Sequence, residues 1–295
     1  MKSSFILSIL LFGTLILHAQ DDNLLKLLEE KEKEDKPKKE FVTATFKATR
    51  IVNGYSVELP AKYHLQFYIA HRFGNIFDNG WREFFGIDNA DMRIGGEYGI
   101  TDWLSAGWGR SSVGGTFDFM ARVKFLRQSK SPRKIPLTMV WFSDLAISSA
   151  KMADYVETNH RLSYAHQLLI ARKFTRSFSL QIMPTYIHWN LTQTPQERND
   201  QFSLGIGGRL LVTPSIGLNL EYFQPLIKTE DGRFYVGSLG FALDIETGGH
   251  VFQITITNST GMIDQLYQLD NGGYWWDKYL RLGFNIHRNI SFVRG

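Results

Sequence analysis

The chain has 295 residues, of which 43% are hydrophobic and 14% aromatic, with 26 Gly, no Cys and a formal net charge of +4. The absence of Cys excludes a disulfide framework and thiolate metal sites. Beyond the extreme N-terminus, no apolar run approaches the roughly 20 residues that a membrane-spanning helix needs. The mild positive charge does not indicate nucleic acid as a partner.

The first nineteen residues have the pattern of an export signal. Lys2 precedes an almost wholly apolar run from residue 5 to residue 17, and Ala19 is a small residue suited to cleavage. This pattern predicts a secretory signal peptide over 1–19. An uncleaved N-terminal anchor is the alternative, but the apolar run is short for one.

Residues 20–40 form a strongly charged leader. Four leucines at 24, 25, 27 and 28 lie on one face of a short potential helix, and the charge run reaches Pro37. One interpretation is a solvated, partly helical periplasmic leader. The other is a small docking helix for a periplasmic partner.

From residue 61 onward, apolar and polar residues alternate with a period of two, which indicates strands. In 201–212, for example, Phe202, Leu204 and Ile206 alternate with Ser203 and Gly205. Twelve such segments are expected: 61–73, 89–100, 102–110, 115–125, 136–148, 158–173, 177–190, 201–212, 215–227, 233–246, 249–258 and 276–290.

These segments exceed the five or six residues typical of soluble strands. Length, number, aromatic content and export together predict a transmembrane antiparallel up-and-down β-barrel over 61–295, with its apolar face toward lipid and its polar face inward. A soluble two-sheet sandwich is the alternative. Aromatic residues near the strand ends are expected in interfacial girdles: Tyr63, Trp108, Trp141, Trp189, Tyr222, Tyr235 and Trp276.

The links between strands alternate in length. Short ones begin with Thr at 101, 175 and 213, while long ones follow the intervening strands. Bacterial barrels have tight periplasmic turns and longer external loops. We therefore expect the outer membrane of a diderm bacterium, with both termini periplasmic. Residues 41–60 are not needed for this parity; they are expected either to cap the periplasmic side or to plug the lumen, a thirteenth strand being the alternative.

Two sequence blocks carry a family resemblance. The run FKATRIVNGYSVELPAKYHLQFYIAHRFG at 46–74 and the run MRIGGEYGITDWLSAGWGRSS at 92–112 resemble a family of bacterial outer-membrane β-barrels catalogued as a domain of unknown function. The resemblance implies localisation and fold, and it transfers no catalytic or ligand residue. The chain departs from the usual aromatic barrel terminus, because Phe292 is followed by three further residues.

Charged residues on the polar face predict the lining of the lumen. Their signs are mixed and nearly balanced, which favours a narrow interior of paired charges over a strongly ion-selective pore. The expected lining residues are Arg72, Asp91, Arg93, Glu97, Asp118, Arg122, Lys124, Asp144, Arg209, Glu221, Asp244 and Arg281.

Histidines give little evidence of chemistry. His64 and His287 are expected to project inward from the first and last strands, where they form a possible polar cluster. Ser163 falls on the strand face opposite to His160 and His166, so these neighbours cannot form a nucleophile and its base. His166 falls on the predicted lipid face. No metal site, cofactor or catalytic residue is predicted.

The sequence thus predicts a non-enzymatic barrel, most simply a small-solute conduit. A closed barrel that anchors or scaffolds a periplasmic or surface partner is the alternative, and a lumen or rim lipid-modifying enzyme is a third. The expected partners are outer-membrane lipid, the barrel-insertion machinery and a periplasmic protein at the leader.

Overall fold

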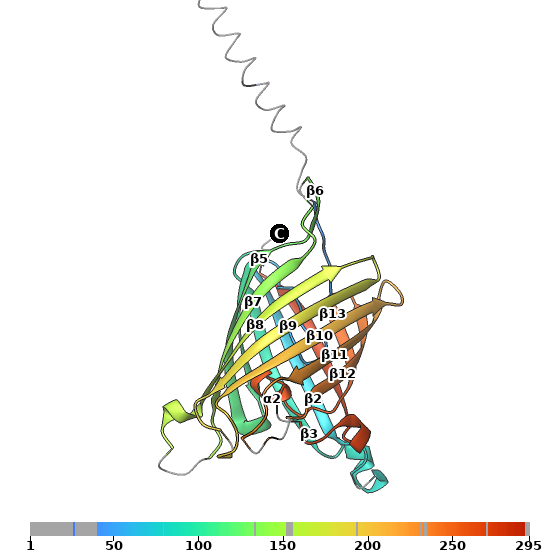
Figure 1. Ribbon diagram of the computed structural model, residues 1–295. Helices are drawn as coiled ribbons and strands as arrows, with labels where there is room; N and C mark the ends of the chain where they lie inside the picture. The colour runs from blue at the N-terminus through green and yellow to red at the C-terminus, as the bar shows by residue number, and fades with distance from the viewer. Residues whose placement is uncertain are drawn as a thin grey trace, which may run out of the picture. The chain divides into compact units, whose positions relative to one another are not determined.

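The computed structural model describes residue 26 and residues 40–78, 80–132, 134–151, 156–192, 194–230, 232, 235–269 and 271–292. Twelve antiparallel strands close into a barrel (Figure 1). The predicted twelve-stranded barrel is therefore confirmed, and the sandwich and the thirteen-stranded barrel are wrong. Its strands are β2 (His64–Asn75), β3 (Ala90–Gly99), β4 (Leu104–Ser111), β5 (Thr116–Leu126), β7 (Thr138–Ser148), β8 (Leu162–Lys173), β9 (Phe178–Trp189), β10 (Asp200–Leu211), β11 (Ile216–Pro225), β12 (Ser238–Thr247), β13 (His250–Thr257) and β14 (Arg281–Ser291).

The two faces of the barrel are inverted relative to a soluble protein. On β5, Phe119 points outward and is 56% exposed, whereas Arg122 points inward and is 0% exposed. The same alternation runs along every barrel strand, as expected where the outer face meets lipid. No described helix is both long and apolar enough to cross a membrane.

The recurrent Thr links share one hydrogen-bonding pattern. The Thr101 hydroxyl oxygen accepts from the Leu104 amide at 3.0 Å, and Thr175 and Thr213 accept in the same way from amides three residues on, also at 3.0 Å. A side chain that accepts from its own turn replaces a backbone contact and tightens the link. We call this side of the barrel the turn end and the opposite side the loop end.

Residues 42–60 fold as a hairpin inside the barrel. Both of its arms enter the lumen from the turn end. The chain reverses at Asn53-Gly54, where the Ile51 amide donates to the Gly54 carbonyl at 2.8 Å. Ile51 and Val52 are 0% exposed. We call residues 42–60 the plug hairpin.

A second segment enters from the loop end. Residues 258–280 join β13 to β14, and their first part contains the short helix α2 (Asp264–Tyr267; Figure 1). All four residues of α2 are buried. Tyr267 belongs to the same apolar cluster as Ile51 and Val52. Short 3₁₀ segments lie in other loops: η1 (Gly80–Gly86), η2 (Val113–Gly115) and η3 (Thr158–Arg161). A fourth, η4 (Trp275–Asp277), lies in the same link as α2.

Two of the expected girdle residues face the interior instead. Trp189 and Tyr235 pack against the apolar cluster of the lumen, while Trp108 and Trp141 are about half exposed on the outer face. Trp189 shares the inward parity of its strand, so the alternation itself explains its position.

A separate two-stranded sheet pairs β1 (Glu40–Phe41) with β6 (Ser129–Ser131). Within it, Lys130 Nζ lies 3.1 Å from a carboxylate oxygen of Glu40. The predicted signal peptide and nearly all of the predicted leader lie outside the described residues.

Candidate functional site

The tip of the plug hairpin is held by one buried carboxylate. Glu221 of β11 is 0% exposed and accepts from three successive backbone amides: Val52 at 3.1 Å, Asn53 at 2.6 Å and Gly54 at 3.1 Å. Glu221 thus satisfies three amides that would otherwise be buried without partners.

Uncharged amide side chains continue this binding around the wall. Gln181 of β9 accepts from the Val57 amide at 2.9 Å and donates to the Tyr55 carbonyl at 2.7 Å. Gln253 of β13 donates to the Ile51 carbonyl at 3.0 Å. The hairpin backbone is thereby paired with side chains in place of a neighbouring strand.

Two further residues bind the tip from the strands that close the barrel. Asn285 of β14 donates to the Val52 carbonyl at 2.9 Å, and Arg72 of β2 donates to the Asn53 side-chain carbonyl at 2.9 Å. The hairpin tip is therefore bonded to strands on several sides of the lumen.

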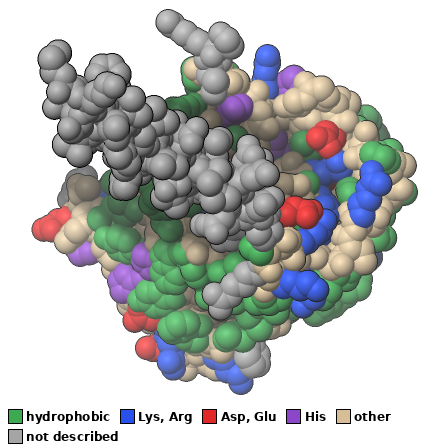
Figure 2. Space-filling model, turned by 90° about the horizontal axis from the view of Figure 1, so that it is seen from above, with side chains coloured by type: hydrophobic (Ala, Val, Ile, Leu, Met, Phe, Trp, Pro, Cys, Tyr) green, Lys and Arg blue, Asp and Glu red, His purple; other side chains and the backbone are tan. Residues whose placement is uncertain are grey.

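At the turn end, basic side chains bind the outer part of the hairpin. Arg209 donates to the Ala44 carbonyl at 3.0 Å, and Lys173 donates to the Thr43 carbonyl at 2.8 Å. Lys47 of the hairpin reaches outward to the carboxylate of Glu246. Figure 2, which looks onto this end, shows acidic and basic side chains around the entrance.

Two ion pairs lie within the wall itself. Arg93 pairs with Asp118, and Arg122 pairs with Glu97 through contacts of 2.9 and 2.6 Å. Arg122 also donates to the Ser56 carbonyl of the hairpin at 2.8 Å. Buried charges of this kind are tolerated only when their partners satisfy them.

Glycines of β10 make room for the contents of the lumen. A Cβ at Gly207 would lie 2.6 Å from Cδ1 of Ile51, and a Cβ at Gly205 would lie 2.4 Å from the Phe223 ring. Glycine at these two positions therefore leaves space for the Ile51 side chain and the Phe223 ring.

The loop-end segment closes the other side of the lumen. Gln265 donates to the Asp144 carboxylate at 3.0 Å, and Gln268 pairs with Ser203. The Tyr267 ring meets the Phe223 ring edge-on, with centroids 5.1 Å apart. Phe223 also lies against Gly54, so one ring separates the hairpin tip from α2.

Little open space is left inside the barrel. A cavity of about 10 Å³ lies between Arg50, Tyr68 and Glu97, enough for about one water. Larger hollows of about 120 and 450 Å³ lie toward the loop end, the second beside Arg161 and Ile263. The plug hairpin and the loop-end segment therefore occupy the middle of the lumen, where their apolar side chains pack together.

The structure separates the remaining predicted lumen residues into interior and rim positions. Asp244 is 1% exposed and accepts from Gln253 at 2.7 Å. Asp91, Lys124 and Arg281 are only partly buried, nearer the ends of their strands. The predicted charges thus divide between wall pairs, hairpin contacts and the rim.

The expected cluster of His64 and His287 does not form. Their strands are neighbours as predicted, but the register places Ser291 opposite His64 and Tyr68 opposite His287. His287 lies 3.1 Å from Gln253, while His64 lies at the turn end. Nor do three potential His, Asp or Glu metal ligands meet anywhere in the described ranges.

Sequence reasoning missed the uncharged residues that bind the hairpin. Gln181, Gln253 and Asn285 have inward parity on their strands, and that parity could have found them. The pair Asn53-Gly54 is a hairpin signal between two strand-like runs, and it could have predicted the chain reversal.

Comparisons with solved structures return other barrels. The chain is similar to the NanC porin (10% identity, TM-score 0.49, 78% of this chain and 100% of that one) and to the KdgM porin (8% identity, TM-score 0.46, 78% and 99%). It is also similar to an outer membrane channel from Pseudomonas putida F1 (10% identity, TM-score 0.46, 79% and 97%). No curated protein matches the chain.

A family model described as "membrane bound beta barrel domain" (DUF5777) matches residues 46–290, a range that includes most of the plug hairpin and nearly all of the barrel. The predicted resemblance to a barrel family of unknown function is confirmed, and the chain belongs to this family of membrane-bound β-barrels.

Proposed function

We propose that this protein is a gated conduit for small polar solutes in the outer membrane of a diderm bacterium, with the plug hairpin as its gate and both termini in the periplasm. The observation that carries the proposal is the way the lumen is filled. Wall side chains such as Glu221, Gln181 and Gln253 bond to the hairpin backbone. The occupant is thus a separate piece of chain whose backbone is held by polar contacts, while Ile51 and Val52 pack in the apolar cluster.

The connectivity of the hairpin allows it to leave. Both of its arms meet the wall at the turn end: Val42 bonds to Gln128, and Tyr63 bonds to Gly99 just after the second arm. Withdrawal toward the periplasm would thread no loop and break no pair of barrel strands. The exposed lumen would then carry carboxylates, guanidinium groups and amides, which suit small polar solutes of either charge.

A closed barrel that anchors or scaffolds a partner is the second candidate. It is favoured by the occupation of the lumen from both ends, with Tyr267 and the hairpin tip meeting on opposite sides of Phe223. In that case the hairpin is a permanent core, and the leader that precedes it serves as the attachment point.

A reversible lock distinguishes the two. A Cβ at Gly240 of β12 would lie 3.2 Å from Cβ of Val52, close to the roughly 3.5–4.5 Å found in disulfides. Since the chain has no Cys, the double variant V52C/G240C adds one cysteine pair that ties the hairpin to the wall. The two single variants are matched controls.

Planar-bilayer conductance is measured for each protein before and after reduction. For a gated conduit we expect spontaneous openings in the wild type and the single variants, silence in the oxidised double variant, and recovery on reduction. If the wild type stays silent and only a deletion of residues 42–60 conducts, the conduit is wrong and the closed barrel is favoured.

A further inference from the structure

A serine and a histidine form a hydrogen-bonded pair on the outer face of the barrel. Ser143 of β7 lies opposite His166 of β8 in the strand register, and Ser143 Oγ lies 3.0 Å from His166 Nδ1. Their chain neighbours Phe142 and Gln167 are 0% exposed and point inward. The pair therefore faces the lipid, several residues from the loop end.

The hydrogen bonds around this pair leave one donor unused. Trp141 Nε1 donates to Ser143 Oγ at 2.9 Å, so the serine hydroxyl proton is available for His166 Nδ1. We assign the serine hydroxyl as the donor to Nδ1, which places the remaining imidazole proton on Nε2; the described residues supply no partner for that proton. The imidazole ring lies beside Trp141, at 6.0 Å between centroids, and beside Tyr186, at 6.3 Å. A polar group in this apolar band is costly unless something accepts its proton.

An apolar groove opens next to His166. It has a volume of about 460 Å³, within the range of small-molecule sites, and its floor includes Leu168, Pro184 and Leu204. The pairing of β8 with β9 is interrupted there: it stops at Gln167 and resumes at Ile170. Proline has no amide proton to give to the ladder and is unusual inside a central strand, so Pro184 accounts for the interruption.

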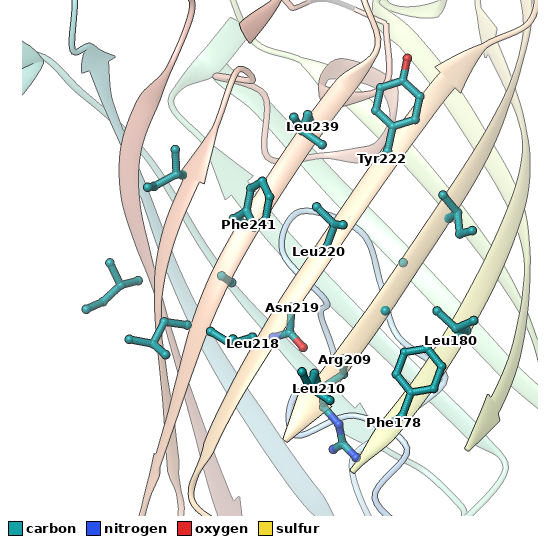
Figure 3. Close-up of a pocket in the computed structure, with 17 residues that line it drawn as sticks. Phe178, Leu180, Arg209, Leu210, Leu218, Asn219, Leu220, Tyr222, Leu239 and Phe241 are labelled. Carbon is teal, nitrogen blue, oxygen red and sulfur yellow. The ribbon is translucent and has the colours of Figure 1, made fainter. Parts of the chain in front are cut away.

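A larger groove on β9–β13 is a useful contrast. It has a volume of about 540 Å³, and its outward side chains are apolar, as Figure 3 shows for Leu180, Leu220 and Phe241. The Tyr222 hydroxyl at its edge already donates to Gln224 at 2.7 Å. That groove accepts any hydrocarbon, whereas the one beside His166 also offers a directed N–H.

We propose that the groove beside His166 binds one acyl chain of a glycerophospholipid, and that His166 Nε2–H donates to the ester carbonyl of that chain. The occupant follows from the location, because a lipid-facing groove meets acyl chains, and an ester carbonyl is the acceptor nearest to them. The pairing of β7 with β8 runs unbroken past Ser143, so the backbone amides there are committed to the ladder. That ladder offers no oxyanion site beside Ser143, so the proposed role of the pair is to bind the ester and not to cleave it.

The test compares two lipids that differ in the carbonyl alone. Full-length protein in detergent is titrated with a diester phosphatidylethanolamine or with its diether analogue, and native mass spectrometry measures the bound fraction. One hydrogen bond predicts about fivefold tighter binding of the diester by the wild type. His166→Leu is expected to abolish that preference, and His166→Gln, which keeps an N–H donor, is expected to retain part of it.

His71→Leu is the matched control. His71 also faces outward, on β2, where its ring stacks on Phe284 at 4.7 Å. We expect this variant to keep the wild-type preference for the diester. Equal binding of both lipids by the wild type would overturn the proposal without any variant. Loss of the preference in His71→Leu, or release of lysolipid that depends on Ser143, would also overturn it.

Discussion

Replacing Glu221 with Gln tests whether one carboxylate holds the hairpin tip in the lumen. Its Oε1 accepts from Asn53 at 2.6 Å, and its Oε2 accepts from Val52 and Gly54, both at 3.1 Å. Glutamine keeps one oxygen but turns the other into a donor. If the NH₂ group takes the place of Oε2, the Val52 amide faces another donor. The Gly54 amide then keeps only its longer contact, of 3.3 Å, to the remaining oxygen.

The magnitude follows from these contacts. A buried donor left without a partner costs about 1–3 kcal/mol, so we expect E221Q to weaken the inserted hairpin by about 2–4 kcal/mol. Since every 1.4 kcal/mol is tenfold, the equilibrium between withdrawn and inserted hairpin shifts by roughly 30- to 1,000-fold. Hydrogen exchange of the amides in 42–60 measures this shift directly, and single-channel open probability shows whether withdrawal opens a path.

Asp91→Asn provides the matched control. Asp91 lies on the inward face of β3, but its hydrogen bond goes to Ser112 at 2.8 Å and not to the hairpin. We expect hairpin exchange in this variant to match the wild type. If E221Q also exchanges at the wild-type rate, Glu221 does not hold the hairpin and the reasoning fails. If E221Q exchanges faster but does not conduct, Glu221 does hold the hairpin, but withdrawal of the hairpin does not open a path and the conduit is wrong.

Three other predictions concern the ion pairs of the wall, the glycines of β10 and the loop-end segment. Arg122→Met leaves the Glu97 carboxylate buried without its partner, so we expect a loss of about 3–5 kcal/mol in urea unfolding, and less in the double variant with Glu97→Gln. Gly207→Val places a side chain where Ile51 lies 2.6 Å from the Cβ position, and faster exchange of 42–60 is expected. Burial raises the pKa of Asp264 above its ordinary value of 3.8. The buried loop-end segment therefore binds this proton more tightly than a withdrawn one, and its insertion weakens as pH rises through the raised pKa. Proteolysis of this segment should increase as pH rises from the acidic range, and Asp264→Asn should reduce that dependence.

The barrel was predictable because its signal is repeated in every strand. Period-two alternation identified all twelve strands, and the alternating link lengths predicted which ends are tight turns. The predicted ends of the strands were less accurate than their number. The strand expected from 233 is observed from Ser238, and just before it the Gly237 carbonyl accepts from the Asn258 side chain at 2.9 Å and not from a neighbouring strand.

The contents of the lumen were harder to predict, because they depend on contacts between residues far apart in the chain. Alternation predicts that Glu221 and Arg72 face inward, but it does not predict that one accepts from Asn53 and the other donates to it. The loop-end segment was expected to be an ordinary long loop. Its apolar residues Met262 and Leu266 carried a signal for burial, which alternation cannot detect outside a strand.

The same side chains that close the barrel would line it when open. Glu221, Gln253 and Asn285 bond to the hairpin backbone, so withdrawal would leave them facing the lumen without those partners. If the lumen stayed dry, these polar side chains would have no hydrogen-bond partners, and the free-energy cost would keep the hairpin inserted. The cost is offset only if water or a polar solute takes the place of the hairpin amides and carbonyls. In the proposed conduit, opening and filling would therefore be one event, and a solute rich in amide-like donors and acceptors should favour the open state more than a simple ion does.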